Sequence, residues 1–284
     1  MPNATTAPTA WFVTGCSTGL GRALALRVLE GGQRCVATAR DRASLGDLAA
    51  RFPATSLTLS LDVTDDAARR AALAQAEAAF GGIDVLVNNA GHGYLAAIEE
   101  GDEDIIRDMF ETNFFALAAI VRAALPGMRA RRRGHIVNIS SIGGLEANHG
   151  SGYYSASKFA VEGLSQALAK EVEPHGIRVT LIEPGPFRTD FNGRSMKTAK
   201  FPLDAYADSV GKRRAQMLAS SGRQAGDPVR AADAIIAIVA SDQPPLHVQF
   251  GRAAVDRARG KFRDMLRSTD EWEAVGVATD FPAP

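Results

Sequence analysis

The 284-residue chain has little cysteine and no excess of charge of either sign, and each shortage excludes a class of protein. Two cysteines are too few for a disulfide-stapled secreted domain. Cys16 and Cys35 are expected at opposite ends of two neighbouring parallel strands, too far apart to bond, so we expect no disulfide. Lysine and arginine total 32 against 32 acidic residues, which leaves no basic field for nucleic acid. The basic cluster at 129–133 is typical of a solvated helix end.

Long hydrophobic runs are also missing. The most apolar stretch, 114–121, ends at Arg122 and is much shorter than the roughly 20 residues of a membrane span. The first residues, 1–9, have neither the basic region nor the apolar run of a signal peptide, and we expect a disordered tail there. These features predict a cytoplasmic protein without a nucleic-acid or membrane partner.

Short apolar runs alternate with helical periods from residue 11 onward. The predicted strands are 11–13, 35–38, 57–61, 85–87, 135–139, 177–182 and 246–250, and the main predicted helices are 20–28, 45–51, 65–80, 102–132, 152–173, 203–219 and 228–241. Repeated β-α-β units predict an α/β fold: a Rossmann-type doubly wound, mainly parallel sheet of seven strands with helices on both faces. No linker divides the chain, so we expect one domain over 1–284, with a substrate lid at 186–225.

A glycine-rich segment lies between the first predicted strand and the first helix. There, backbone amides and the helix dipole can receive a pyrophosphate. The spacing Gly-x3-Gly-x-Gly differs from the Gly-x-Gly-x-x-Gly fingerprint, so the segment by itself is moderate evidence for dinucleotide binding. The residues expected to contact the phosphates are Gly15, Ser17, Thr18, Gly19, Leu20 and Gly21.

Several further motifs follow in a fixed order along the chain. They are Asp62-Val63, Asn88-Asn89-Ala90-Gly91, Asn113, Ser140-Ser141, Tyr154-x3-Lys158 and Pro184-Gly185. With the glycine segment, this series resembles the short-chain dehydrogenases/reductases over about residues 10–190. The resemblance implies hydride transfer between a nicotinamide cofactor and a carbonyl or secondary alcohol.

Tyr154 and Lys158 stand at i and i+4 of a predicted helix and therefore project from one face. A phenol working near neutral pH needs its pKa lowered by about three units, worth about 4 kcal/mol. An ammonium about 4 Å away supplies about that much at an effective dielectric of 20. Tyr153 has Ser157, not lysine, four residues later. We therefore expect Tyr154 to be the general acid/base.

The resemblance assigns the other catalytic roles. Ser141 hydrogen-bonds the substrate carbonyl, with Ser140 as the alternative, and Asn113 helps to hold a water relay that reaches Lys158. Lys158 also binds the nicotinamide ribose. The remaining cofactor contacts are expected from Asp62, Val63, Asn89, Ala90, Gly91, Tyr154, Pro184, Gly185, Phe187 and Thr189.

The end of the second predicted strand indicates which nicotinamide is used. An acidic residue there accepts from a ribose 2′-hydroxyl, whereas a basic residue meets a 2′-phosphate. Ala39 takes the place of the NAD-selecting acid and Arg40 follows it, which favours NADP(H). Asp41 leaves NAD(H) open. The five histidines show no metal-ligand spacing, so surface or loop positions are expected for them and metal catalysis is not indicated.

The segments expected to face the substrate are 93–95, 142–150, Tyr153 and the stretch after Pro186, and they contain few fixed charges. Their apolar members are Tyr94, Leu95, Ile142, Leu145, Phe187, Phe191, Met196 and Phe201. The motifs GYYSASK and EPGPFRTDF resemble hydroxysteroid- and retinol-dehydrogenase-like members, which favours an apolar substrate. We expect 187–202 to be mobile without ligand, because Gly193, Ser195 and the lysines give little to hold it.

The long helices and the retained catalytic residues give expectations for the oligomeric state and for whether the protein is an enzyme or a sensor. The family habit of pairing the long helices at 102–132 and 152–173 implies a homodimer or homotetramer. A protein that senses NADP(H) through the same fold without turnover is the rival class. Such proteins can lose the tyrosine or the lysine, and this chain keeps both.

Overall fold

The computed structural model describes residues 9–281. The expected tail at 1–9 lies outside the described residues except for Thr9, whose amide donates to Gln33 Oε1 at 2.6 Å. Seven parallel strands form one sheet in the order β3-β2-β1-β4-β6-β7-β9, which confirms the expected fold class. Their bounds are β1 Ala10–Val13, β2 Arg34–Ala39, β3 Ser56–Ser60, β4 Val85–Asn88, β6 Gly134–Ile139, β7 Ile177–Pro184 and β9 His247–Phe250.

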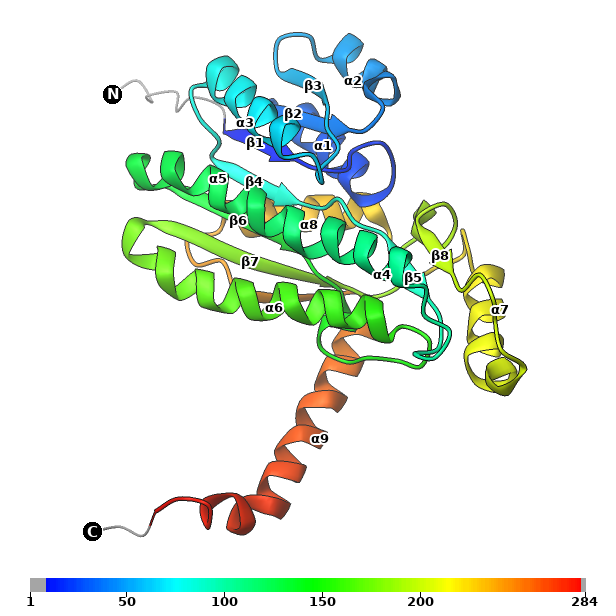
Figure 1. The fold of residues 1–284 in the computed structure, drawn as a ribbon. Helices are drawn as coiled ribbons and strands as arrows, with labels where there is room; N and C mark the ends of the chain where they lie inside the picture. Colours follow the sequence, from blue (N-terminus) through cyan, green and yellow to red (C-terminus); the bar gives the residue numbers. More distant parts are fainter. Residues whose placement is uncertain (1–8, 282–284) are drawn as a thin grey trace.

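Helices cover both faces of the sheet (Figure 1). On one face, α3 (Asp66–Phe80), α5 (Ala116–Arg131) and α6 (Gly152–Val172) pack on side chains such as Phe12 and Leu86. On the other, α1 (Gly19–Glu30), α2 (Gly46–Arg51) and α8 (Pro228–Ala240) pack on Trp11 and Val87. Strands buried on both faces have apolar residues at every position, as β1 has, and do not alternate.

The helical stretch expected at 102–132 is present over Glu103–Arg131, but it contains a π-helical turn. Helix α4 (Glu103–Phe110) passes into a π-helical turn at Glu111–Phe115 before α5 begins. Among the described residues, one helical stretch, Glu103–Arg131, is long and apolar enough to cross a membrane by length and composition. Its buried side chains Leu117, Ile120 and Val121 belong to the core against the sheet, and core helices pass the same test.

The chain after Pro186 is more regular than expected. Strand β8 (Met196–Thr198) pairs in parallel with β5 (Gly93–Leu95) to form a second, two-stranded sheet. A short 3-10 turn, a π turn at Ala207–Gly211 and α7 (Lys212–Ala219) follow. Neither β5 nor β8 was expected, because three-residue strands carry too little alternation to be recognised.

A ninth helix, α9 (Arg252–Val277), follows β9 and leaves the body of the molecule (Figure 1). The strand and helix pattern above ended at 250, so this helix was missed. The apolar residues Val255, Ala258, Phe262 and Met265 recur at three- and four-residue spacing and were a readable signal for it.

Candidate active site

A pocket of about 720 Å³ opens at the carboxyl ends of the parallel strands, where ligands bind in doubly wound sheets. Of the residues expected to form the site, Gly21 and Asn113 do not line this pocket. The others do: Gly15, Ser17, Thr18, Gly19, Leu20, Arg40, Asp62, Val63, Asn89, Ala90, Gly91, Ser141, Tyr154, Lys158, Pro184, Gly185, Phe187 and Thr189.

The glycine segment is fastened to the end of β4 by side chains that reach across. The Thr14 hydroxyl accepts from the amides of Asn89 and Ala90, both at 2.9 Å. Asn89 Nδ2 donates in return to the carbonyls of Thr14 and Gly15 at 2.9 and 3.1 Å. Gly15 has φ +71°, and a Cβ on it would lie 2.9 Å from Ala90 Cα. Only glycine therefore fits this turn without strain.

Gly21 does not line the pocket, but it lets the neighbouring segments that do line it pack closely. A Cβ on Gly21 would overlap the Asn89 side chain and lie 2.6 Å from the Gly15 carbonyl oxygen. Thr18, which precedes α1, makes no side-chain capping bond, so the first amides of this helix have no side-chain partner. Free amides at a helix N-terminus beside a close-packed glycine loop fit a pyrophosphate.

Tyr154 and Ser141 come together from different elements. Tyr154 lies in the first turn of α6, and Ser141 follows β6 and caps a short 3-10 turn, where its Oγ accepts from the Gly143 amide at 3.0 Å. A Cβ on Gly143 would lie 3.3 Å from Ser141 Oγ and 3.4 Å from Tyr154 Cε1, so the two side chains lie close together. The Ser140 hydroxyl is instead buried without a hydrogen-bond partner among the described residues, and it lies on the side of Glu162: a Cβ on Gly144 would be 2.8 Å from Ser140 Oγ and 3.2 Å from Glu162 Oε1. The geometry therefore favours Ser141 over Ser140 as the partner of Tyr154.

Lys158 is bonded to the end of β6 and lies near the ring of Tyr154. Its Nζ donates to the Ile139 carbonyl at 2.8 Å and lies 6.0 Å from the centre of the Tyr154 ring. Burial raises the pKa of Tyr154 to about 12, and the nearby Ser141 hydroxyl opposes this only in part. The expected lowering of the tyrosine pKa is therefore not found in this geometry, because desolvation dominates. Burial also lowers the pKa of Lys158 to about 8.

Asn113 lies in the π turn and is 1% exposed. Its Nδ2 donates to the His92 carbonyl at 2.9 Å and its Oδ1 accepts from the His92 amide at 3.0 Å. A Cβ on Gly91 would lie 3.0 Å from Asn113 Oδ1 and 3.8 Å from Lys158 Nζ. Asn113 thus fixes the chain after β4, close to the lysine.

Tyr153 is directed away from the pocket. Its hydroxyl donates to the Ile98 carbonyl at 2.7 Å. Of the apolar residues expected to face the substrate, Leu145 and Phe201 also do not line the pocket. Leu145 packs toward α9, and Phe201 is 80% exposed. The apolar lining comes from Tyr94, Leu95, Ile142, Phe187, Phe191 and Met196.

The lid residues make contacts that the sequence did not indicate, and the expected mobility of 187–202 without ligand stays a prediction. Lys197 pairs with Asp108 at 2.7 Å and Lys200 with Asp102 at 3.2 Å, so these lysines join the lid to α4 and to the residue before it. The pairing of β8 with β5 adds backbone bonds. These contacts could not be expected from the sequence, because the acids that pair with the two lysines lie far away along the chain.

The pocket carries more charge than expected. Arg213 of α7 and Arg257 of α9 line it, and Arg213 Nε is buried with no hydrogen-bond partner among residues 9–281. Burial and the nearby Arg257 lower the pKa of Arg213. Arg257 pairs with Glu146 at 2.9 Å. No sequence motif marked these residues, since they meet only through the packing of α9 beside the loop after Ser141.

Histidines lie inside the structure more often than expected. His135 on β6 is 4% exposed and hydrogen-bonds Thr180 at 2.9 Å. His92 lines the pocket, with Nε2 3.2 Å from Asp108 Oδ2, and burial lowers its pKa. His247 Nδ1 lies 2.7 Å from Glu183 Oε1. A surface position was therefore wrong for His135.

His247, Glu183 and Glu162 form a compact cluster behind Lys158. One ligand atom from each lies within 4.8 Å of the others, which is close enough to hold a metal ion. Sequence spacing did not show this grouping, because the three residues come from β9, β7 and α6. Burial raises the pKa of Glu162 to about 8. A raised pKa keeps Glu162 protonated at neutral pH, which lowers the negative charge of the cluster.

The residues that would meet the adenosine ribose lie beyond β2. Arg40 is exposed and lines the pocket, whereas Asp41 accepts from the Ala43 amide at 2.9 Å and does not line it. The Asp62 carboxylate accepts from the Thr64 amide and hydroxyl at 2.9 and 2.7 Å. The carboxylate of Asp41 therefore caps the turn that follows it and does not point into the pocket.

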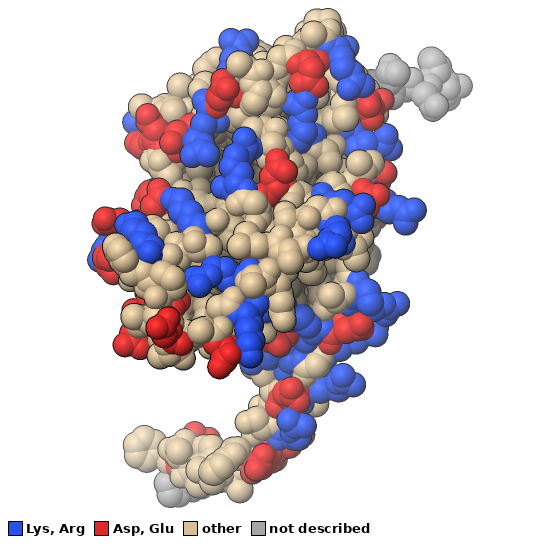
Figure 2. Space-filling model, turned by 90° about the vertical axis from the view of Figure 1, so that its right-hand side faces the viewer, with Lys and Arg blue, Asp and Glu red and all other residues tan. Residues whose placement is uncertain are grey.

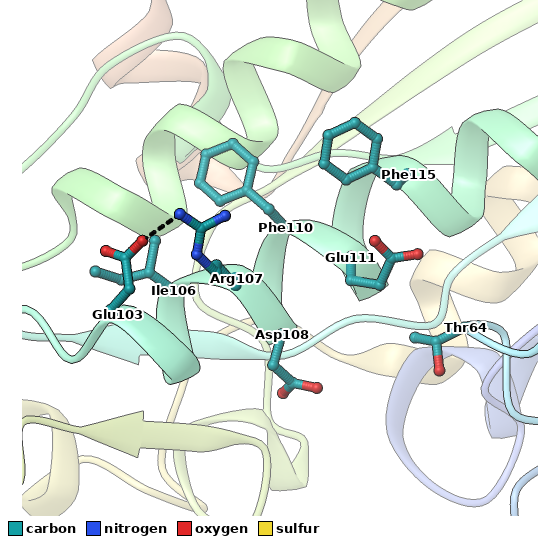
Figure 3. Close-up of a pocket in the computed structure, with 8 residues that line it drawn as sticks. All are labelled: Thr64, Glu103, Ile106, Arg107, Asp108, Phe110, Glu111 and Phe115. Atoms are coloured by element: carbon teal, nitrogen blue, oxygen red, sulfur yellow. Dashed lines mark ion pairs between the residues drawn. The ribbon is translucent and has the colours of Figure 1, made fainter.

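A second hollow, of about 650 Å³, lies on the outer side of α4 and the π turn, where Phe110 and Phe115 stand above Glu111 (Figure 3). Arg107 pairs with Glu103 at its rim at 2.5 Å. Tyr154 and Lys158 do not line this hollow. It shares Thr64 and Asp108 with the larger pocket, so the two hollows adjoin.

Comparison with known proteins agrees with this geometry. The model of the short chain dehydrogenase family matches residues 9–200. Oxidoreductase BOA17 of Botryotinia fuckeliana is 36% identical over 95% of this chain and 98% of its own length. Human retinol dehydrogenase 8 is 35% identical over 86% of this chain and 81% of its own.

Solved structures agree as well. A short-chain dehydrogenase from Streptomyces avermitilis has a TM-score of 0.91 and 41% identity, covering 97% of this chain and 100% of that one. A metagenomic short-chain oxidoreductase in complex with NADP has a TM-score of 0.68 and 27% identity, covering 86% and 98%. Other neighbours in fold are complexes with NAD or NADP. The chain belongs to the short-chain dehydrogenase/reductase family and is an oxidoreductase that acts on CH–OH or C=O groups.

Proposed function

We propose that this protein transfers a hydride between NADP(H) and the carbonyl or secondary alcohol of a mainly apolar substrate, with Tyr154 as general acid/base. The observation that carries the proposal is that Tyr154 and Ser141 lie close together at a pocket that Lys158 and the glycine segment also line. A carbonyl oxygen placed between the two hydroxyls would accept from both.

The protonation states suit reduction. Because burial raises the pKa of Tyr154 to about 12, its phenol is protonated at neutral pH and can donate to the substrate oxygen. Ser141 polarises the same oxygen. Lys158, held at the Ile139 carbonyl, is close enough to Tyr154 to stabilise the phenolate left after proton donation. Bound nicotinamide supplies or accepts the hydride. Alcohol oxidation is the reverse, with Tyr154 as base.

The choice of NADP(H) over NAD(H) rests on Arg40 and Asp41. Arg40 lines the pocket where a 2′-phosphate would lie, and a guanidinium binds phosphate through charge-assisted hydrogen bonds. Asp41 would have to give up the Ala43 amide to accept from a 2′-hydroxyl. The geometry therefore favours the phosphorylated cofactor.

For the substrate we propose a bulky apolar ketone or secondary alcohol. Tyr94, Leu95, Ile142 and Phe191 line the pocket, and Phe191 stacks near Tyr154 with ring centres 5.8 Å apart. The similarity to a retinol dehydrogenase supports this class. The pocket lining also includes two cationic side chains, Arg213 and Arg257.

We further propose a cytoplasmic homodimer or homotetramer that pairs through the outer faces of the long helices. Phe115 at the start of this face is 54% exposed, and Phe159 on α6 is 45% exposed. Large exposed aromatic side chains on adjacent helices are typical of contact surfaces. A strictly monomeric mass by light scattering at micromolar concentration would contradict this assembly.

The decisive experiment is a substrate panel followed by the absorbance of reduced nicotinamide. Apolar cyclic and acyclic ketones should be reduced with NADPH, and small charged sugars or hydroxy acids should be poor substrates. A preference for the charged compounds would contradict the proposed pocket. Tight NADPH binding without turnover on any member would instead favour the rival, a cofactor-sensing protein.

A further inference from the structure

Helix α9 (Arg252–Val277) stands away from the rest of the protein (Figures 1 and 2). Its 26 residues give a length of about 39 Å at 1.5 Å per residue. Only Ala254 and Ala258 are buried, and they pack with Ile142 at the root of the helix. From Phe262 to Val277 every residue of α9 is exposed, so this part lacks the tertiary packing on which helices in proteins mainly depend.

The free part of α9 carries large apolar side chains that face water. Phe262 and Met265 are each 53% exposed and Trp272 is 60% exposed. Leu266, 63% exposed, borders the same stripe. Apolar or small residues recur at alternating spacings of three and four, which is the seam of a two-helix coiled coil. The seam positions are Val255, Ala258, Phe262, Met265, Thr269, Trp272 and Gly276.

Charge is divided along the helix. Residues 252–267 hold six Lys or Arg and two acids, whereas 268–277 hold three acids and no cation. Arg259, Lys261 and Arg263 have no ion-pair partner among the described residues. The same is true of the acids Asp270, Glu271 and Glu273. Two such helices are complementary only when they run in opposite directions.

We propose that α9 is an interaction surface for a second copy of this chain and pairs with α9 of that copy in antiparallel orientation. With Phe262 opposite Trp272 of the second copy, Arg259 comes beside Glu273 of that copy, and the two Leu266 side chains meet at the centre. A bilayer surface fits less well, because interfacial helices are rich in Lys and Arg on their polar face and this helix ends in acids.

The pairing has a consequence for the pocket. Arg257, at the root of α9, donates to the Glu146 carboxylate and carbonyl at 2.9 and 2.8 Å. Glu146 belongs to the loop that follows Ser141. Fixing α9 in a dimer therefore also fixes this loop, independently of any contact through α5 and α6.

The first test is cross-linking of the full-length chain through Leu266→Cys. Cys16 and Cys35 are buried, so they do not compete. Under mild oxidation at micromolar concentration, this variant should become a covalent dimer on a non-reducing gel. Arg267→Cys, at the same height but on the opposite side of the helix, is the matched control and should react at least about tenfold more slowly. Equal rates, or an unreactive Leu266→Cys, would overturn the proposal.

The second test concerns direction and register. In the Leu266→Cys background, Arg259→Glu or Glu273→Arg should each slow cross-linking by about tenfold, because two contacts per dimer become repulsive. The double exchange should restore the rate, and failure to restore it would refute the antiparallel register. A blue shift of Trp272 fluorescence on adding neutral phosphatidylcholine vesicles, with no cross-linking in solution, would assign the surface to a membrane instead.

Discussion

Lys158 donates to the carbonyl of Ile139 at 2.8 Å, and its ammonium nitrogen lies 6.0 Å from the centre of the Tyr154 ring. The lysine is thus one helical turn from the tyrosine but bonded to the end of β6. In this arrangement burial keeps Tyr154 protonated and leaves Lys158 with a lowered pKa of about 8. In the proposed mechanism, the protonated phenol of Tyr154 would donate to the carbonyl oxygen during reduction.

Replacing the tyrosine hydroxyl tests the proposed role directly. Tyr154→Phe should lower kcat by about 10²–10⁴-fold, the usual contribution of a general acid, while the Kd for NADPH changes little. Tyr153→Phe is the matched control, since its hydroxyl bonds to Ile98 outside the pocket, and it should keep near-normal turnover. Steady-state kinetics and fluorescence titration with NADPH measure the two effects. Near-normal turnover of Tyr154→Phe would refute the assignment.

Cofactor selectivity should depend on Arg40. Arg40→Ala removes a charge-assisted contact worth about 1.5–3 kcal/mol and should weaken NADP(H) about 10- to 100-fold, with little change for NAD(H). Arg42→Ala is the control, because the Arg42 guanidinium bonds to Thr58 at 3.3 Å and does not line the pocket. Equal losses for both cofactors in titrations would show that Arg40 does not select the 2′-phosphate.

Glu162 should make stability depend on pH. Burial raises its pKa from 4.5 to about 8, so between these values the folded chain holds a proton that the unfolded chain releases. The free energy of unfolding therefore falls as pH rises through this window, by on the order of a few kcal/mol. In Glu162→Gln this fall should be reduced, as measured by urea unfolding at about pH 5 and about pH 8. Glu171→Gln is the control, because Glu171 is exposed on the same helix, and it should keep the wild-type dependence of stability on pH. A wild-type dependence in Glu162→Gln would contradict the raised pKa of Glu162.

The glycine segment should be sensitive at Gly21. Its Cβ would displace Asn89, so Gly21→Ala should weaken binding of either cofactor even though Gly21 does not line the pocket. Gly163→Ala on α6 is the contrast: a Cβ there meets no atom within 4 Å. That substitution should stabilise the helix by about 0.5–1 kcal/mol. Calorimetric titration and thermal unfolding separate the two effects, and unchanged NADPH affinity of Gly21→Ala would contradict the packing argument.

The sequence alone determined the main sheet and the composition of the site. Strands such as β1 are apolar at every position because both faces are covered, and helices are periodic, so their order could be predicted. Tyr154 and Lys158 share a helix, so their common face follows from spacing. The place of the glycine segment also follows from the sequence. The turn between β1 and the helix after it has room only for a residue without a Cβ at position 15, and that residue is Gly15.

The tertiary structure decided what depends on contacts between distant segments. Asn113 is buried because the π turn directs it to the backbone of His92, 21 residues away. Lys158 is bonded to Ile139, so the electrostatics of Tyr154 follow from burial and not from the i to i+4 spacing. The lid is anchored by Lys197 to an acid 89 residues earlier in the chain. Pairing over such separations has no local periodicity, and only folding the chain brings these groups together.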